Sequence, residues 1–276
     1  MKIAVLGAGN GALATAADLA LDGFSIRLFE FPEYGANISS FKDSKQINIT
    51  GDANNGTAKL ENVTTSLHEA VENADLILPA VPSYAHEKMA KELANVLKPG
   101  QIVVLSPGST FGSLIYSRVF ADSALGENGA LLGEIHTLPY ACRRKAGQAE
   151  VDVFLKTKKL YFSAFPAKNT QKILTVFKKV FPNAVAFSSV LETGLNNGNP
   201  VTHVAPCVLN AGRIEYAKGE YYHYQEGITP SVAKVIETLD NERLQICQAL
   251  GYREMTTRER ILDLGYSDKE NVGLYE

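Results

Sequence analysis

The chain has 276 residues, of which 45% are hydrophobic and 21% charged, and its formal net charge is −3. This ordinary globular composition is sufficient for one large or two smaller domains, and it lacks the basic surplus of a nucleic-acid-binding protein. No stretch approaches the roughly 20 consecutive apolar residues that a membrane-spanning helix needs, so no membrane association is expected. Three widely separated cysteines without metal-type spacing indicate reduced thiols in a cytoplasmic protein.

In chain order, strand and helix patterns alternate through the first two thirds of the sequence. Strands are predicted at residues 2–6, 25–29, 75–80, 102–105, 130–135, 151–155, 159–164 and 184–187, and helices at 10–22, 83–97 and 167–180. The polar segment 33–65 is predicted to form irregular strands and turns. This alternation is typical of an α/β fold with a doubly wound, mainly parallel sheet.

The pattern changes near residue 188, after which almost no strand signal remains. Long helices are predicted at residues 200–217 and 230–250, and Pro206 favours a kink within the first of them. We therefore predict two domains, an α/β domain over residues 1–187 and a mainly helical domain over residues 188–276.

A glycine-rich turn joins the first predicted strand to the first predicted helix. Residues 7–12 read GAGNGA and fit the G-x-G-x-x-G/A pattern of Rossmann-type dinucleotide-binding domains. In that pattern Gly7 permits the tight turn, Gly9 lets the backbone approach the pyrophosphate, and Ala12 allows the helix to pack closely on the strand. The predicted cofactor-binding residues of this turn are Gly7, Gly9, Asn10, Gly11 and Ala12. The alternative is a glycine-rich turn that binds nothing.

Glu30 closes the second predicted strand. A carboxylate at this place accepts hydrogen bonds from the ribose hydroxyls of NAD and repels the 2′-phosphate of NADP. The sequence therefore predicts NAD or NADP as the cofactor, with NAD favoured.

Two further turns follow the third and fourth predicted strands, at the edge of the sheet where ligands of such folds bind. We predict that Val81 and Pro82 in the first turn, and Pro107 and Gly108 in the second, contact the cofactor. These turns favour a nicotinamide over a flavin. The alternative is that both prolines only shape their turns.

Polar residues recur along the predicted helix at 200–217. Asn199, His203, Cys207 and Asn210 share one helix face if Pro206 does not break the period. Because unpaired buried polar groups are costly, this stripe is predicted to line a substrate cleft between the domains. There His203 can act as a general acid and base, and Asn199 can bind the substrate. The alternative is a capping asparagine and a structural histidine.

The other four histidines show weaker patterns. His68 and His86 lie on helix patterns typical of the surface, His136 follows a strand end, and His223 lies in a tyrosine-rich loop. No pair has metal-ligand spacing, so no metal is predicted.

The sequence resembles the opine dehydrogenases, the octopine/nopaline dehydrogenase group, and especially its bacterial members that make N-(carboxyalkyl) amino acids. Five motifs carry the resemblance: VLGAGNG at 5–11, SPG at 106–108, LPYACR at 138–143, NPVTH at 199–203 and YQEGITPSV at 224–232. The resemblance implies that the amino group of an amino acid joins an α-keto acid, and that hydride from NADH or NADPH reduces the resulting imine.

The resemblance also implies residue roles. His203 matches the proton-relaying histidine of the family, and Asn199 matches a neighbouring active-site position. Thr137 and Cys142 fall in the segment that approaches the keto-acid pocket, and Asn210 is a further candidate substrate residue. Related dehydrogenases that act on a hydroxy or keto group, such as ketopantoate reductase or glycerol-3-phosphate dehydrogenase, remain an alternative, as does a non-catalytic dinucleotide-binding protein.

The chain departs from the family in its helical domain, which is shorter than in other members. The carboxylate-binding arginine and the acidic partner of the histidine have no match. Possible substitutes are Arg143, Arg213, Glu134 and Glu226. A shortened helical domain would expose apolar surface, which favours a homodimer.

Overall fold

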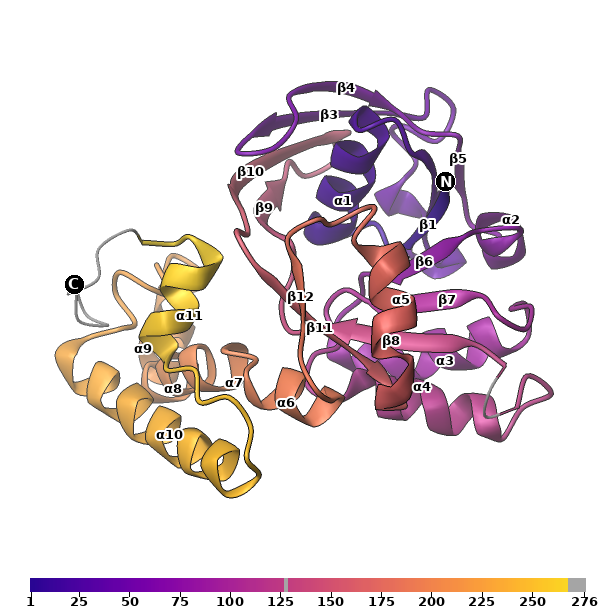
Figure 1. Cartoon of the computed structure of the whole chain (residues 1–276). Coiled ribbons are helices and arrows are strands. Elements are labelled where there is room, and N and C mark those ends of the chain that lie inside the picture. Colours follow the sequence, from indigo (N-terminus) through magenta and orange to yellow (C-terminus); the bar gives the residue numbers. More distant parts are fainter. Residues whose placement is uncertain (127–128, 268–276) are drawn as a thin grey trace. The chain divides into compact units, whose positions relative to one another are not determined.

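The computed structural model describes residues 1–126 and 129–267, and the chain divides into two compact units, Met1–Gly194 and Leu195–Glu276 (Figure 1). The division falls seven residues beyond the predicted boundary at 187, because a short helix, α6 (Val190–Leu195), follows the last strand of the first unit. The last nine residues of the predicted domain 188–276 lie outside the described residues.

An eight-stranded sheet forms the centre of the first unit. Its strands are β1 (Lys2–Leu6), β2 (Ser25–Phe29), β5 (Asn62–Thr64), β6 (Leu76–Pro79), β7 (Ile102–Leu105), β8 (Leu131–Ile135), β11 (Leu160–Phe165) and β12 (Ala184–Ala186). Their order is β12-β11-β8-β7-β6-β1-β2-β5, and all neighbours from β5 to β8 are parallel. The strand order reverses between β1 and β6, which is the point where dinucleotides bind in such sheets.

Helices cover both faces of this sheet, which explains why its strands read as continuous apolar runs. On one face lie α1 (Asn10–Leu21) and α5 (Thr170–Phe177), and on the other lie α2 (Leu67–Val71), α3 (His86–Ala94) and α4 (Gly112–Ala121) (Figure 1). Successive residues of β1 alternate between the two cores: Ile3 and Val5 pack with α1, whereas Ala4 and Leu6 pack with α3 and α4. Short 3-10 turns at Pro32–Asn37, Ser83–Ala85 and Ala167–Asn169 complete the connections.

A second, four-stranded sheet packs over α1. Its order is β4 (Gly56–Lys59), β3 (Gln46–Gly51), β10 (Glu150–Lys156) and β9 (Tyr140–Arg144). The segment 33–65, predicted to form irregular strands and turns, contains β3, β4 and β5 and the turns between them. Besides β4, β3 pairs with β10, about a hundred residues later in the chain, and a local pattern cannot show such a pairing.

Asp18 anchors α1 to the second sheet. Its buried carboxylate accepts hydrogen bonds from Lys156 Nζ (2.7 Å), from the Tyr140 hydroxyl (2.7 Å) and from the backbone N–H of Asn54 (2.9 Å). These partners come from β10, β9 and the β3–β4 turn, so one side chain holds three parts of the second sheet against the dinucleotide-binding helix.

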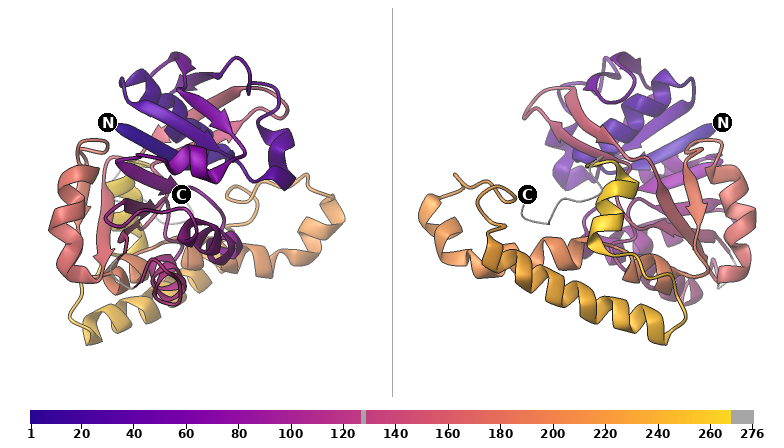
Figure 2. Two further views of the ribbon diagram at one scale, coloured as in Figure 1. Left: turned by 90° about the vertical axis from the view of Figure 1, so that its right-hand side faces the viewer. Right: turned by 60° about the vertical axis from the view of Figure 1, so that its left-hand side comes forward.

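The second unit is helical and comprises α7 (Asn199–Thr202), α8 (Val204–Leu209), α9 (Ala211–Ala217), α10 (Pro230–Ala249) and α11 (Thr257–Leu264) (Figure 2). The predicted helix at 230–250 corresponds to α10, but the continuous helix predicted at 200–217 is wrong. That segment breaks at His203 (φ −106°) and again at Asn210 (φ −111°, ψ 15°). Pro206 has no N–H to donate, so it is tolerated in the first turn of a helix, and the chain restarts as α8 at Val204. The expected kink is confirmed.

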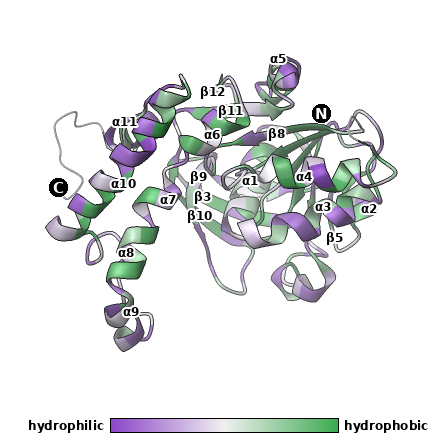
Figure 3. Cartoon of the chain, turned by 90° about the horizontal axis from the view of Figure 1, so that it is seen from below, coloured by the Kyte–Doolittle hydropathy of each residue, from purple (hydrophilic) through white to green (hydrophobic). Residues whose placement is uncertain are grey.

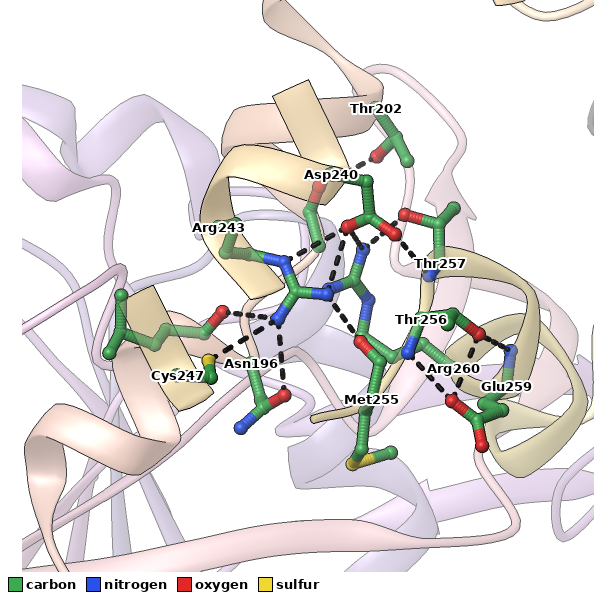
Figure 4. Close-up of polar contacts among 12 residues, drawn as sticks. Asn196, Thr202, Asp240, Arg243, Cys247, Met255, Thr256, Thr257, Glu259 and Arg260 are labelled. Atoms are coloured by element: carbon green, nitrogen blue, oxygen red, sulfur yellow. Dashed lines mark hydrogen bonds and ion pairs between the residues drawn. The ribbon is translucent and has the colours of Figure 1, made fainter. Parts of the chain in front are cut away.

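A buried ion cluster joins the helices of the second unit (Figure 4). The Asp240 carboxylate on α10 accepts hydrogen bonds from Arg243 Nε (2.9 Å), Arg260 Nη2 (3.3 Å) and the N–H of Thr257 (2.7 Å). Arg260 packs so closely against Gly198 that a Cβ there would lie 3.1 Å from its Nε. The cluster therefore holds the start of α7 in place.

No helix in residues 1–126 and 129–267 combines the length and apolar character needed to cross a membrane.

Candidate active site

The glycine turn lies at the reversal of strand order. Gly7 has φ +108°, and a Cβ there would lie 2.8 Å from the carbonyl oxygen of Ala80, which follows β6. A Cβ at Gly9 would meet no atom within 4 Å, so this position faces open space. No side chain caps the N-terminus of α1, and its amide groups and positive dipole end are available to an anion. The turn therefore fits the pyrophosphate of a dinucleotide.

Gly11 and Asn10 of the turn contact the loop after β8 and the strand β9. A Cβ at Gly11 would lie 2.8 Å from Leu138, and Asn10 Oδ1 accepts a hydrogen bond from the N–H of Arg144 (3.0 Å). Ala12, in the first turn of α1, is fully buried, as the close packing of helix and sheet requires.

Glu30 follows β2 beside the glycine turn. Its carboxylate is almost fully buried and accepts hydrogen bonds from the N–H of Ala8 (3.2 Å), the N–H of Phe31 (2.9 Å) and Asn37 Nδ2 (3.0 Å). The predicted ribose-binding carboxylate thus lies beside the turn and is held by three donors of the protein.

Arg144 is a residue that sequence reasoning missed. It reaches the glycine turn from β9, where its guanidinium donates to the carbonyl oxygens of Ala8 (3.0 Å) and Asn37 (2.5 Å). Burial lowers the pKa of Arg144, and the charge of Glu30 opposes this effect. More than a hundred residues of sequence separate Arg144 from Ala8 and Asn37, so no local pattern could predict these contacts. The only sequence feature that pointed to Arg144 was its position directly after the LPYACR motif.

The turns after β6 and β7 lie at the same carboxyl edge of the sheet. Val81 is buried, and its Cγ1 lies 3.3 Å from where a Cβ on Gly7 would be, whereas Pro82 is exposed. Pro107 is half-buried, and Gly108 packs on Glu134, whose Cβ would be 2.6 Å from a Cβ at position 108.

Three consecutive residues after Gly108 have left-handed backbone conformations. Their φ angles are +49° at Ser109, +67° at Thr110 and +67° at Phe111. The buried Glu134 carboxylate on β8 accepts a hydrogen bond from the N–H of Ser113 (2.9 Å) in the first turn of α4. Burial raises the pKa of Glu134, and this hydrogen bond opposes the effect. Glu134 thus supports a strained turn at the sheet edge.

The structure places the candidate substrate residues of the first unit on two different elements. Thr137 is half-buried and follows β8 at the carboxyl edge, and Cys142 lies half-buried in β9. Burial raises the pKa of Cys142 to about 11, although the charge of Arg143 opposes it. Cys142 is therefore a neutral thiol at neutral pH rather than a nucleophilic thiolate.

His86 is not a surface residue, as its helix pattern suggested, but is buried between α3 and α4. Its ring centroid lies 5.7 Å from that of Tyr116, and its Nε2 would lie 3.4 Å from a Cβ on Gly112. Burial lowers the pKa of His86 to about 4, so the ring is neutral near pH 7. The glycine at 112 leaves room for the ring, which the pattern of α3 alone does not reveal.

In the second unit, His203 lies at the junction of α7 and α8 and contacts residues of the loop before α10. Its Nε2 is 2.8 Å from the Tyr224 hydroxyl, and its ring centroid is 5.4 Å from that of His223. Burial lowers the pKa of His203, and the neighbouring His223 lowers it further. Cys207 Sγ lies 3.8 Å from His223 Nδ1. The roles of His223 and Tyr224 were missed, although the tyrosine-rich loop and the YQEGITPSV motif both point to this segment.

The predicted polar stripe is divided by the helix breaks. Asn199 is exposed at the first position of α7, whereas Asn210 donates from Nδ2 to the carbonyl oxygens of Pro206 (2.8 Å) and Gly227 (3.0 Å). Asn210 thereby braces α8 against the loop before α10. Within the described residues, no group of three or more His, Cys, Asp or Glu side chains is arranged to hold a metal ion.

Comparison with known proteins identifies the family. Residues 186–276 match the family described as NAD/NADP octopine/nopaline dehydrogenase, alpha-helical domain, and residues 2–113 match the N-terminus of NAD-dependent glycerol-3-phosphate dehydrogenase. An opine dehydrogenase from Arthrobacter sp. (strain 1C) is 36% identical over 250 residues, which cover 89% of this chain and 67% of the relative. This chain belongs to the opine dehydrogenase family.

Further proteins are similar to this chain in sequence or in fold. A vitopine synthase from Allorhizobium ampelinum is 26% identical over 92% of this chain and 70% of its own length. The structure of an octopine dehydrogenase with NADH and L-arginine superimposes with a TM-score of 0.74 at 20% identity, covering 100% of this chain and 72% of that one. A yersinopine dehydrogenase with bound NADP⁺ gives a TM-score of 0.75 at 15% identity, covering 96% and 67%.

Several expectations are thereby confirmed: the family resemblance, the α/β fold with a helical second domain, and NAD(P) as the cofactor. This chain is an NAD(P)-dependent oxidoreductase that acts on CH–NH bonds. The alternative, a dehydrogenase that acts on a hydroxy or keto group, is less supported. Of the possible substitutes for missing family residues, Arg213 and Glu226 pair with each other (2.9 Å), Glu134 supports the turn before α4, and Arg143 is exposed.

Proposed function

We propose that this opine dehydrogenase condenses an amino acid with an α-keto acid and reduces the product with NAD(P)H, with His203 as the proton relay and Asn199 as a substrate contact. The observation that carries the proposal is the state of His203 within a motif typical of the family. Its ring is half-buried and hydrogen-bonded, and its pKa is lowered, so it is available as a neutral base near pH 7.

The chemistry requires two protons to move from nitrogen to oxygen. An amino acid enters as an ammonium ion, and its nitrogen must lose one proton before it attacks the keto carbon and a second after the attack. The carbonyl oxygen leaves as water, which requires both protons at that oxygen. Neutral His203 accepts each proton in turn from nitrogen and passes it to the departing oxygen, so that water leaves and an iminium ion joins the two substrates. When bound, NAD(P)H supplies the hydride that converts the iminium carbon into that of a secondary amine.

Substitution of His203 tests this role. His203→Ala is expected to retain cofactor binding and to lose turnover by roughly 10²–10⁴-fold, the usual contribution of a general acid–base group. His68→Asn, at an exposed position on α2, is the matched control and is expected to retain full turnover. Turnover is followed as NADH oxidation across a panel of amino acids with pyruvate, and it should require both substrates. Unchanged turnover in His203→Ala contradicts the assignment.

The same panel separates the alternative functions. Oxidation or reduction of a single hydroxy or keto acid would support the related dehydrogenases that act on C–OH bonds. Tight NADH binding without turnover across the panel would support a non-catalytic dinucleotide-binding protein.

We infer that Thr137 and Cys142 contact the keto acid and that NAD is preferred over NADP because of Glu30. Support for the first comes from the half-buried positions of both residues on segments that follow β8. Support for the second is the placement of Glu30 beside Ala8, at the end of β2. Asn210 remains a weaker substrate candidate, since both hydrogen bonds of its amide group go to the backbone.

The assembly that we propose is a cytoplasmic homodimer. Val204, Val208 and Leu209 on α8 are each more than half exposed, and α8 is a mainly hydrophobic helix (Figure 3). Such a group of apolar side chains is typical of an interaction surface. Three free cysteines support a reducing compartment. Sedimentation equilibrium of the protein and of Val208→Glu tests the dimer, which the substitution should weaken.

A further inference from the structure

An exposed ion pair joins α3 to the turn after β2. Lys88 Nζ on α3 contacts the Glu33 carboxylate in the 3-10 turn Pro32–Asn37, and it lies 4.4 Å from the centre of the Phe31 ring. Phe31 directly follows Glu30, and its N–H donates to Glu30 Oε1 (2.9 Å). The ammonium group of Lys88 is therefore held over the neighbour of the carboxylate that we expect to contact the ribose.

The other end of the same turn is fixed beside Glu30. Asn37 donates from Nδ2 to Glu30 Oε2 (3.0 Å), and its carbonyl oxygen accepts a hydrogen bond from Arg144 Nη2 (2.5 Å). The segment from Glu30 to Asn37 therefore borders the carboxyl end of β2. At this place Rossmann-type domains hold the 2′-hydroxyl of NAD or the 2′-phosphate of NADP.

Three cations of the surrounding elements differ in how firmly their donors are engaged. Arg27 of β2 donates to a carboxylate and to two backbone carbonyl oxygens of the segment 61–72. Arg144 of β9 donates to two backbone carbonyl oxygens. Lys88 instead contacts the side chain of Glu33, and these two side chains are 47% and 44% exposed. Both ends of this ion pair can therefore rotate away from each other into water.

A phosphate would compete with Glu33 for the lysine. An ion pair between exposed side chains contributes little to stability, because water and salt screen it. A phosphate monoester carries about 1.5–2 negative charges at pH 7, whereas a carboxylate carries one, and an ammonium group binds phosphate as a point charge. A 2′-phosphate at the ribose would attract Lys88 and repel Glu33.

From this arrangement we propose that Lys88 binds the 2′-phosphate of NADP(H), and that Glu33 holds Lys88 when the phosphate is absent. Lys88 then favours NADPH, whereas Glu33 opposes NADPH binding together with Glu30. The inference rests on the proposed contact between Glu30 and the ribose. It adds the cation through which a site that prefers NADH also accepts NADPH.

The test uses NADH and NADPH as probes, because these dinucleotides differ only in the 2′-phosphate. Lys88→Met should weaken NADPH binding about 10-fold, the lower limit for a hydrogen bond to a charged group, and leave NADH binding as in the parent. Glu33→Gln should strengthen NADPH binding about 3-fold relative to NADH, as expected for the loss of one exposed ion pair. Fluorescence titration of the full chain measures both dissociation constants.

A second ion pair on α3 provides the matched controls. Lys91 Nζ lies 2.6 Å from the Glu87 carboxylate, and each of these side chains is 63% exposed. Lys91→Met and Glu87→Gln change the net charge of the protein by the same amounts on the same helix. Both variants should keep the NADPH-to-NADH affinity ratio of the parent, so a general effect of charge is distinguished from a contact with the phosphate.

The double variant Glu33→Gln/Lys88→Met tests whether Glu33 acts through Lys88. Without the lysine, Glu33→Gln should give no gain in NADPH affinity, and a full gain would overturn the proposed link. Equal affinity ratios in Lys88→Met and Lys91→Met would overturn the inference. So would an equal loss of both dinucleotides in Lys88→Met, since the ion pair would then only shape the turn.

The variant Glu30→Gln separates this inference from the proposed preference for NAD. If Glu30→Gln changes the affinity ratio while Lys88→Met behaves like Lys91→Met, only the role of Lys88 fails. If Glu30→Gln and Lys88→Met both keep the ratio of the parent, the proposed role of Glu30 fails together with the inference. None of these binding measurements depends on the proton relay at His203.

Discussion

At the scale of single residues, Glu30 and Arg144 are oppositely charged groups that contact the same two partners. Glu30 accepts from Ala8 N–H and Asn37 Nδ2, and Arg144 donates to the carbonyl oxygens of these same residues. We therefore propose that cofactor choice depends on these two charges rather than on one acidic strand end. The glycine motif and Glu30 were predictable because they are local in sequence, whereas Arg144 was not.

Glu30→Gln isolates the effect of the negative charge. Glutamine keeps one acceptor oxygen, which can still accept from Ala8 N–H and Asn37 Nδ2, and it gives up only the hydrogen bond from Phe31 N–H. We expect NADPH to bind more tightly relative to NADH, because the repulsion of the 2′-phosphate is removed. Fluorescence titration with both dinucleotides measures the ratio. A ratio that does not change contradicts a role for Glu30 in cofactor choice.

Arg144→Ala should weaken the binding of both dinucleotides. The substitution removes the hydrogen bonds from the guanidinium to the carbonyl oxygens of Ala8 and Asn37. The glycine turn therefore loses a stabilising contact, and the site loses a positive charge. Arg143→Ala, at the exposed position one residue earlier, is the control and should bind both cofactors as the parent does. Equal affinities in the two variants would show that Arg144 has no part in cofactor binding.

At the scale of elements, regular periodicity predicted the strands β1, β2, β6, β7 and β8 well, because each is a short apolar run beside a turn. The segment 199–217 was predicted less well. Breaks at His203 and Asn210 divide it into three short helices, and His203 occupies a break rather than the face of a long helix. At that position His203 contacts His223 and Tyr224 in the loop before α10. Helical periodicity cannot predict this contact.

The turn between β7 and α4 depends on Glu134. Glu134→Ala removes the acceptor for the Ser113 N–H in a buried place, and we expect a loss of about 1–3 kcal/mol in the free energy of unfolding. Cofactor affinity should fall as well, since the residues from 109 to 111 lose their support. Glu134→Gln keeps an acceptor oxygen and should retain most of both properties. Urea unfolding and NADH titration of the two variants check this, and equal behaviour of alanine and glutamine would argue against the supporting role.

At the scale of the whole first unit, the second sheet is attached to the dinucleotide-binding helix through Asp18. Burial by itself would raise the pKa of Asp18, but the hydrogen bonds from Lys156, Tyr140 and Asn54 outweigh it and lower the pKa below its usual value. The ionised form is therefore favoured in the folded state. The sequence contained Asp18 in an alanine-rich helix, but its partners Asn54, Tyr140 and Lys156 are distant in sequence, so a local pattern could not show these contacts.

The consequence is a stability that depends on pH. A carboxyl group with a depressed pKa in the folded state stabilises the protein above its unfolded pKa of about 4, and this contribution is lost as the pH falls through the folded value. Asp18→Asn should cost about 1.5–3 kcal/mol at pH 7, the usual range for hydrogen bonds to a charged group. The difference from the parent should shrink near pH 3. Urea unfolding at both pH values measures this, and a difference that is independent of pH would contradict the prediction.

The left-handed conformation of Thr110 has a consequence for any search for heat-resistant variants of this enzyme. A β-branched residue is poorly suited to a φ of +67°, whereas glycine or asparagine adopts it readily. Random mutagenesis selected only for survival at high temperature should therefore return Thr110→Gly or Thr110→Asn. The same variants, screened instead for turnover, should be rejected if the turn after β7 needs its present shape. Thr110 would then be a position at which natural selection has retained catalytic activity at a cost in thermal stability.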